Sequence, residues 1–438
     1  MSWRERLGRN WGRLGMRFNI WKDCPKVPIT ELLSFIVDNR GKTVPTADDG
    51  WKLIATNCVT NNTLFPVYEK VRYLTQETYE TWFRAHPMPG DILFVNKGTP
   101  GRVCLVPDPV DFCIAQDMIA LRADDEKIYN KYLFAVLRSR EIQQQIYNTN
   151  VGDVIPHFKK QFMDQLLIPV PDRRIQEIIG NLYYELSYKT ELNKKINKNL
   201  EQQAVVLFRS WFSAFSLSPN SPRINSEFGE IPEDFEVVKV GSLPMLVTDY
   251  VANGSFASLK ANVNLYQEPN YAYFIRNTDL KSGTFGVCVD QPSYEFLSKS
   301  TLYGGEIIIS NVGDVGSVFL CPKLDGRMTL GNNIIMLRPE DDLLRYYLYI
   351  WFKYLQGPAL IQGIKGGSAQ PKFNKTDFKN TSILIPPKDI LTRFHETVAP
   401  MFETISQRQT ETSCLTDLRD TLLPQLMSGE LDVSGIVL

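Results

Sequence analysis

The sequence has few of the residues that build metal centres, disulfide frameworks or histidine-based active sites. Its 438 residues include three histidines and seven cysteines. The cysteines are odd in number and scattered, and no two of them form a Cys-x-x-Cys pair. We therefore expect neither a zinc site nor a set of disulfides, and we expect a reducing compartment, the cytoplasm.

Long apolar runs and an excess of one charge are also lacking. No stretch of 18 apolar residues occurs, which predicts that no helix spans a membrane. With 48 basic and 49 acidic residues the net charge is -1, so the chain as a whole gives no signal for nucleic-acid binding. Residues 1–26 are locally basic, with seven Arg or Lys against Glu5 and Asp23. This basic N-terminal arm would contact a DNA backbone, act as a transit peptide, or simply be a solvated start.

Most catalytic motifs are missing. The sequence has no His-Glu-x-x-His and no Gly-x-Ser-x-Gly, and Gly41-Lys-Thr43 has Ile36 where a phosphate loop needs glycine. One permissive pattern is present. Asp108, Asp125 and Lys127 fit the spacing of magnesium-dependent nucleases, in which carboxylates hold the metal and lysine supports the attacking water. The alternative is a solvated loop.

The chain contains two copies of one pattern. The matched segments are residues 53–63 with 274–284, 90–96 with 305–311, 115–122 with 331–338, and 152–158 with 367–373. Order and spacing persist while side chains differ. This duplication predicts two similar modules and a pseudo-two-fold molecule, which suits a target with two separated halves.

Each module is expected to be α+β. Short apolar runs predict buried strands at 91–95 and 306–310, where glycine precedes them, and at 118–121 and 334–337. Glycines predict tight turns with positive φ between these strands, at 98–101 and 313–316. One helix should follow in each module, over 130–147 and 343–362, and then a glycine loop and a closing strand.

A heptad pattern follows each module. Apolar positions step by four and three from Ile175 to Leu207 and, 219 residues later, from Phe394 to Leu426, with a polar gap at matching places. Such a repeat favours two long antiparallel helices that pair as a coiled coil, roughly 60 Å long at 1.5 Å per residue. The alternative is two amphipathic helices, each packed on its own module. The predicted seam consists of Leu182, Leu186, Ile196, Leu200, Met401, Ile405, Leu415 and Leu422.

These patterns divide the chain into five segments. Prolines and serines between 216 and 232 mark the linker between the modules. The segments are the arm (1–26), the first module (27–171), a central spacer helix (172–213), the linker and second module (214–387), and a distal spacer helix with the C-terminal tail (388–438).

Polar residues of types that suit DNA contacts gather on the loops of both modules. Asn or Gln can pair with adenine, Arg or Lys with guanine, and Lys or Ser with phosphate. For any single residue the alternative is ordinary polar loop surface. The candidates are Asn96, Lys97, Thr99, Arg102, Lys159, Lys160, Arg276, Asn277, Asn311, Asp314, Ser317, Lys365, Ser368, Gln370, Lys372 and Lys375.

Several segments stand out beside the paired module-and-helix layout. These segments are Tyr132 to Pro171, Leu207-Phe-Arg-Ser-Trp-Phe212, Gly367-Ser-Ala-Gln-Pro-Lys-Phe373 with Ile385-Pro-Pro387, and Leu422-Leu-Pro-Gln-Leu-Met-Ser-Gly-Glu-Leu431. In this layout and these segments, and over nearly its whole length, the chain resembles the DNA-specificity subunits of type I restriction–modification enzymes.

The resemblance implies a non-catalytic subunit with two target-recognition domains, each binding one half of a bipartite DNA site, and helices that set the spacer. It implies partners that carry the cofactors: modification subunits with S-adenosylmethionine, and restriction subunits with ATP and magnesium. Since the chain is near neutral, these partners would supply much of the phosphate contact. A two-module protein–protein adaptor and the nuclease remain the alternatives.

Overall fold

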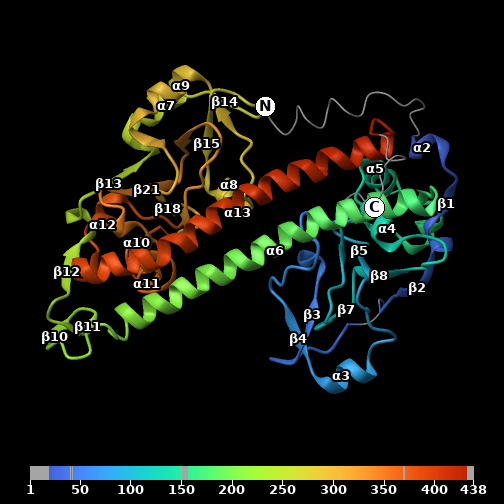
Figure 1. The fold of residues 1–438 in the computed structure, drawn as a ribbon, viewed down its shortest axis with the longest axis horizontal. Coiled ribbons are helices and arrows are strands. Elements are labelled where there is room, and N and C mark those ends of the chain that lie inside the picture. Colours follow the sequence, from blue (N-terminus) through green and yellow to red (C-terminus); the bar gives the residue numbers. More distant parts are fainter. Residues whose placement is uncertain (1–18, 40, 42, 150–155, 368–369, 432–438) are drawn as a thin grey trace. The chain divides into compact units, whose positions relative to one another are not determined.

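The protein folds as two compact units, one formed by Met1–Asn193 with Glu411–Leu438 and the other by Lys194–Thr410. The computed structural model describes residues 19–39, 41, 43–149, 156–367 and 370–431 (Figure 1). Each unit therefore contains one α+β domain and a part of each of the two long helices. No helix in the described ranges is long and apolar enough to cross a membrane.

The first unit is built on two sheets and one separate strand pair. One sheet is antiparallel throughout, and the other joins β3 to β7 in parallel. The first sheet has the order β2 (Leu33–Val37), β8 (Met118–Ala123), β5 (Ile92–Val95), β6 (Val103–Leu105). The second has the order β4 (Arg72–Leu74), β3 (Trp51–Ile54), β7 (Phe112–Ile114), and β1 (Lys26–Pro28) pairs with β9 (Leu167–Pro169).

The second unit repeats this plan with extra strands. Its antiparallel sheet has the order β13 (Met245–Asp249), β21 (Ile334–Pro339), β18 (Ile307–Ser310), β19 (Val318–Leu320). Its other sheet has the order β14 (Leu265–Tyr266), β16 (Cys288–Val289), β15 (Ala272–Ile275), β20 (Arg327–Leu330), β17 (Thr301–Leu302). The remaining pairs are β12 (Glu236–Lys239) with β22 (Ser382–Ile385) and the linker hairpin β10 (Arg223–Ser226) with β11 (Gly229–Pro232). Because β15 pairs in parallel with β20, as β3 does with β7, the predicted duplication of an α+β fold is confirmed.

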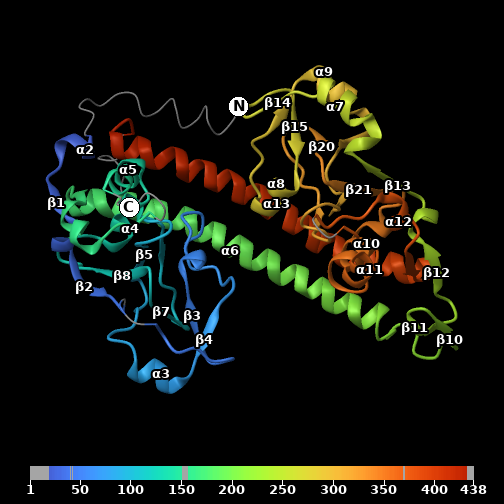
Figure 2. The same ribbon diagram turned by 180° about the vertical axis from the view of Figure 1, so that it is seen from behind.

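The short helices at the far end of each unit are partly shared. Both views place α3 (Gln76–Thr81) at the end of the first unit away from α4 and α5, and α7 (Phe256–Asn262) and α9 (Gln291–Phe296) at the end of the second unit away from α10 and α11 (Figures 1 and 2). Helix α9 follows β16 as α3 follows β4, at the offset of 215 residues that also relates the matched segments, so these two helices correspond. No helix among the described residues between β2 and β3 corresponds to α7.

The two helices expected at 130–147 and 343–362 are each interrupted. In the first unit α4 (Asn130–Leu137) and α5 (Arg140–Asn148) are separated at Ser139, whose hydroxyl caps α5 by accepting from the Ile142 amide. In the second unit α10 (Leu343–Tyr354) and α11 (Gly357–Gly363) are separated just before Pro358, which lies in the first turn of α11. A cap residue and a proline favour a new helix start over continuation, so the prediction of single helices was wrong.

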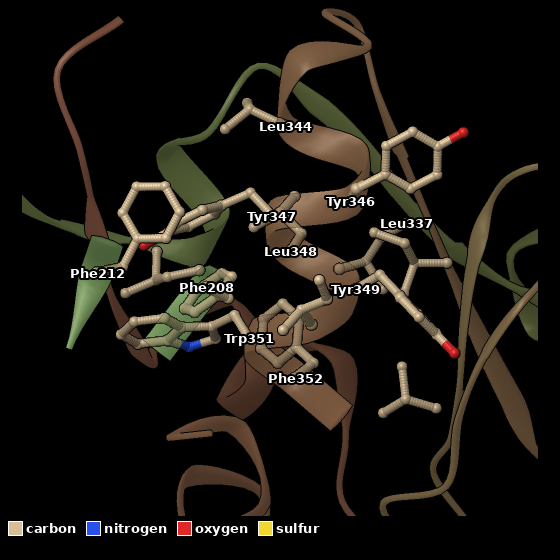
Figure 3. Packing of buried hydrophobic residues seen from close by; sticks show 14 of the residues in the cluster. Phe208, Phe212, Leu337, Leu344, Tyr346, Tyr347, Leu348, Tyr349, Trp351 and Phe352 are labelled. Carbon is tan, nitrogen blue, oxygen red and sulfur yellow. The ribbon is translucent and has the colours of Figure 1, made fainter. Parts of the chain in front are cut away.

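The two long helices are α6 (Arg173–Phe212) and α13 (Lys388–Ser428), close to the predicted ranges. Within the first unit, Asn193 of α6 donates to Glu411 of α13, whereas Tyr183 lies under Arg419. Later residues of α6 therefore contact earlier residues of α13, so the two helix segments are antiparallel. In the second unit the core contains Phe208 and Phe212 of α6 beside α10, and Figure 3 shows both rings on the side of α10 that carries Tyr347 and Trp351.

The buried face of α6 in the first unit is wider than the predicted seam. Leu182, Leu186 and Leu422 line the contact between the two helices but remain half-buried. Ile179 and Asn193, which lie on the predicted heptad, are fully buried, and Tyr183, Ser187 and Thr190, one residue beyond heptad positions, are buried as well. A helix enclosed by a partner helix and a domain buries a wider stripe than a coiled-coil seam. Of the other predicted seam residues, Met401 and Ile405 pack on the second core and Ile196, Leu200 and Leu415 are half-buried.

Part of the predicted N-terminal arm belongs to the first unit. Helix α2 (Ile20–Asp23) follows Asn19, which caps it, and the Ile20 side chain is buried in the core beside α4 and α6. The folded domain therefore begins before residue 27, whereas residues 1–18 of the predicted arm lie outside the described residues.

Candidate nucleic-acid interface

In each domain, the glycine turn after β5 or β18 is hydrogen-bonded to the glycine loop that precedes β9 or β22. The Gly98 amide donates to the Pro156 carbonyl at 2.9 Å, and the Gly313 amide donates to the Pro371 carbonyl at 3.0 Å. The structure thus brings together, twice, two loops that are about 60 residues apart in the sequence.

Positive φ angles shape both turns as predicted. The φ values are 85° at Gly98 and 87° at Gly101 in the first domain, and 76° at Gly313 and 96° at Gly316 in the second. Side chains other than glycine seldom adopt this conformation, so these positions fix the backbone. The residues between and beside the glycines are free to differ between the two domains.

Asn96 and Asn311 hold the turns in place. Asn96 is fully buried; its side-chain Nδ2 donates to the Phe158 backbone carbonyl at 3.2 Å, and its backbone carbonyl accepts from the Phe158 backbone N–H. The equivalent Asn311 is half-buried, and its backbone carbonyl accepts from the Phe373 backbone N–H at 3.1 Å. A completely enclosed side chain cannot touch a base edge, so the predicted DNA contact of Asn96 is contradicted and the residue positions the turn instead.

The first domain presents basic side chains around its turn. Arg102 and Lys159 are exposed, whereas Lys97 and Thr99 are half-buried on the same turn. The exposed Lys160 lies 3.5 Å from the carboxylate of Asp38. The local charge therefore suits phosphate oxygens.

In the second domain, helix α8 (Asn277–Ser282) lies beside the turn. Arg276, just before α8, makes a double contact with the buried Asp279 at 2.9 and 2.6 Å, which raises the pKa of the arginine. This arginine is occupied with capping α8, so its position supports the predicted base contact less well than the other candidates.

Asp314 is the centre of a polar cluster at this turn. Its carboxylate accepts from Lys281 at 2.6 Å, from Ser317 at 2.5 Å and from Asn277 at 3.5 Å. The hydrogen bond from Lys281, followed by that from Ser317, lowers the pKa of Asp314. Lys281 was not among the sequence candidates. Its position four residues after Asn277, on the same face of α8, was the available signal.

The glycine loop of the second domain forms a small hairpin. Gly366 and Lys372 exchange backbone hydrogen bonds at 2.8 and 2.9 Å, and Lys365, Gln370 and Lys372 are exposed around it. Lys375 is half-buried and paired with Asp249 at 3.0 Å. Ser368 lies outside the described residues.

The nuclease candidates do not form a site. Asp108 and Asp125 are exposed, and Lys127 pairs with its neighbour Asp124 at 3.0 Å. Among the described residues, no group of three or more His, Cys, Asp or Glu side chains could hold a metal ion. The polar residues of the two turns are arranged for hydrogen bonds and ion pairs.

The sequence profile of the type I restriction modification DNA specificity domain matches residues 28–202 and 232–411, once for each domain with its long helix. The chain belongs to this family. The family assignment identifies the chain as a specificity subunit of a type I restriction–modification system, a non-catalytic DNA-recognition component, and it does not favour the adaptor or the nuclease.

Individual relatives are distant but similar in length. The MjaIX specificity subunit of Methanocaldococcus jannaschii is 26% identical over 360 residues, which are 79% of each chain. The HindI specificity subunit of Haemophilus influenzae is 24% identical over 408 residues, covering 78% of this chain and 86% of the relative. The crystal structure of a type I restriction-modification S subunit from M. genitalium, 17% identical, matches 95% of this chain and 98% of that chain with a TM-score of 0.53, which extends the likeness to the fold.

Proposed function

We propose that each domain recognises one half of a bipartite, asymmetric DNA site, and that the paired helices set the number of unread base pairs between the halves. The observation that carries this proposal is the duplicated turn, which has the same glycines and backbone hydrogen bonds in both domains but different side chains. One backbone with two sets of side chains suits the recognition of two different half-sites in the same manner.

The same proposal assigns the chemistry to partner subunits. Modification subunits that carry S-adenosylmethionine dock on the helices and domains, and restriction subunits that use ATP and magnesium join them. The chain itself holds no cofactor and works in the cytoplasm. Because its net charge is only -1, the partners contribute much of the phosphate contact that duplex DNA requires.

The direct test is DNA binding by the purified full-length chain, alone and with its modification subunits. Retardation of a duplex from a randomised library, followed by sequencing of the bound fraction, should yield two short conserved blocks separated by a fixed number of unselected positions. A bound fraction without conserved blocks would contradict the proposal.

The spacer function has its own test. Removing residues 194–200 together with 403–409 deletes one heptad from each helix, which keeps the same helix faces in contact. The helix pair should become shorter by about 10 Å, which corresponds to about three base pairs. The selected blocks should keep their sequences and move closer together. If their separation stays unchanged, the helices do not measure the spacer.

A further inference from the structure

The cluster around Asp314 differs in chemistry from the equivalent place in the first domain. The position 215 residues earlier holds Thr99, and the first turn carries Lys97 and Arg102 in place of an acid. Both side chains of the Lys281–Asp314 pair remain accessible, with 48% of the lysine side chain and 43% of the aspartate side chain exposed. A carboxylate on a surface that binds DNA would repel phosphate groups, so its presence there calls for a specific role.

The surroundings hold this ion pair in a fixed position. Ser317 and Asn277 both donate to the same carboxylate oxygen of Asp314 that accepts from Lys281. The other oxygen of Asp314 is left for an outside donor, and the lysine ammonium keeps two further N–H groups. The turn is also tied through Gly313 to the hairpin whose exposed Lys372 can hold a phosphate.

The donors and acceptors of the pair match the major-groove edge of a G·C base pair. In that groove guanine presents acceptors at O6 and N7, and cytosine presents the N4 amino donor. The guanine O6 and the cytosine N4 are themselves hydrogen-bonded, at about 2.9 Å. The Lys281 ammonium lies 2.6 Å from one oxygen of Asp314, so a donor and a carboxylate stand side by side and the second oxygen is left for the cytosine amino group. An A·T pair also presents a neighbouring donor and acceptor, but only guanine places two acceptors side by side for the two remaining N–H groups of the lysine.

We propose that Lys281 and Asp314 together read one G·C base pair in the half-site of the second domain. Lys281 donates to guanine and Asp314 accepts from the cytosine amino group. This inference rests on the proposed function and assigns to the second domain a specificity-determining pair for which the first domain has no counterpart at the matching turn position.

The test is selection of duplexes from a randomised library by the full-length chain with its modification subunits. The wild-type protein should select a G·C pair at one position of one half-site. Asp314→Ala and Lys281→Ala should each reduce the preference at that position by about tenfold and leave the other half-site intact. Asp314→Asn, which places a donor and an acceptor on one side chain, should shift the preference toward A·T.

Asp325→Asn is the matched control, because it removes one acidic charge from an exposed loop of the same unit. It should leave all base preferences unchanged, and circular dichroism should show that each variant is folded. The inference is overturned if the wild-type protein selects two half-sites while both alanine variants keep its full pattern, or if the position that they affect is an A·T pair. A wild-type protein that selects no sequence at all overturns the proposed function itself.

Discussion

At the scale of single residues, each unit encloses one carboxylate at the start of its central strand and neutralises it with an arginine. Asp91 contacts Arg122 and Glu306 contacts Arg338, both at 2.9 Å. The acids are only 2% and 3% exposed, whereas the arginines are about 30% exposed. Removing a partner from a buried charge is costly because that charge stays desolvated.

We predict that Arg338→Met destabilises the second unit by about 2 kcal/mol, less than a fully buried pair would lose because water still reaches the guanidinium. Urea unfolding followed by amide exchange in β18 and β21 would measure this. Arg345→Met is the control: its partner Asp342 is 64% exposed, so the change should stay within about 0.5 kcal/mol. If both variants lose the same free energy of unfolding, the burial of Glu306 does not make its ion pair with Arg338 more important than an exposed pair.

Asp290 offers a pH-dependent test. It caps α9 by accepting from the Ser293 amide at 3.0 Å, and hydrogen bonds from Ser293 lower the pKa of Asp290 to about 2. Because the folded pKa lies below the ordinary value of 3.8, this contribution is complete above about pH 4 and is lost as the pH falls toward 2. Asp290→Ala should therefore cost about 1 kcal/mol at pH 7, and the gap to wild type should narrow between pH 4 and 2 in unfolding measurements. If the difference in stability between Asp290→Ala and the wild type does not change with pH, the ionised Asp290 carboxylate does not stabilise α9.

Residue type alone predicts the role of some residues at the turns and not of others. Glycine at the turns was predictable because few other residues adopt positive φ. Asn96 was not, since asparagine is equally suited to a base edge and to a buried loop tie, and only the fold decides between them. Lys281 was missed because its importance comes from Asp314, which is distant in sequence.

At the scale of elements, periodicity predicted β5, β8, β18, β21 and the two long helices with nearly the right bounds. It failed where a local cap or tertiary packing intervened. The apolar spacing of 130–147 continues across Ser139, so the break between α4 and α5 depends on a local cap. The buried stripe of α6 is wider than the predicted seam because this helix faces both a domain and a second helix.

Gly180 allows α6 and α4 to approach closely. A Cβ atom there would lie 2.6 Å from the Tyr132 amide nitrogen and 2.9 Å from the Lys131 carbonyl carbon. We predict that Gly180→Ala destabilises the first unit by about 1–3 kcal/mol because α4 must move, although alanine normally favours a helix. The position 219 residues later is Ala399, and Ala399→Gly should cost only about 1 kcal/mol. Thermal unfolding of both variants is the measurement, and a more stable Gly180→Ala protein would refute the close approach.

At the scale of the whole molecule, the two domains should contribute to DNA affinity separately. We predict that replacing Lys365, Gln370 and Lys372 by alanine impairs selection at one half-site alone. It should also reduce the slope of log affinity against log salt by about 0.9 for each phosphate that no longer has a cationic partner. Lys299→Ala, an exposed lysine elsewhere in the same unit, is the control and should change neither. Impaired selection at both half-sites would mean that these residues support the fold rather than DNA binding.

Each unit contains a part of both long helices, and this limits where the chain can be cut. Leu423, Leu426 and Met427, from the last turns of the protein, complete the core that begins at Ile20, and Phe208 and Phe212 complete the core of the later domain. Neither half is a continuous piece of sequence, so a fragment that stops at residue 193 would leave part of its interior uncovered and should aggregate. A single protease cut in the linker after Phe212, by contrast, should leave two fragments that copurify, because each still carries side chains that close the interior of the other.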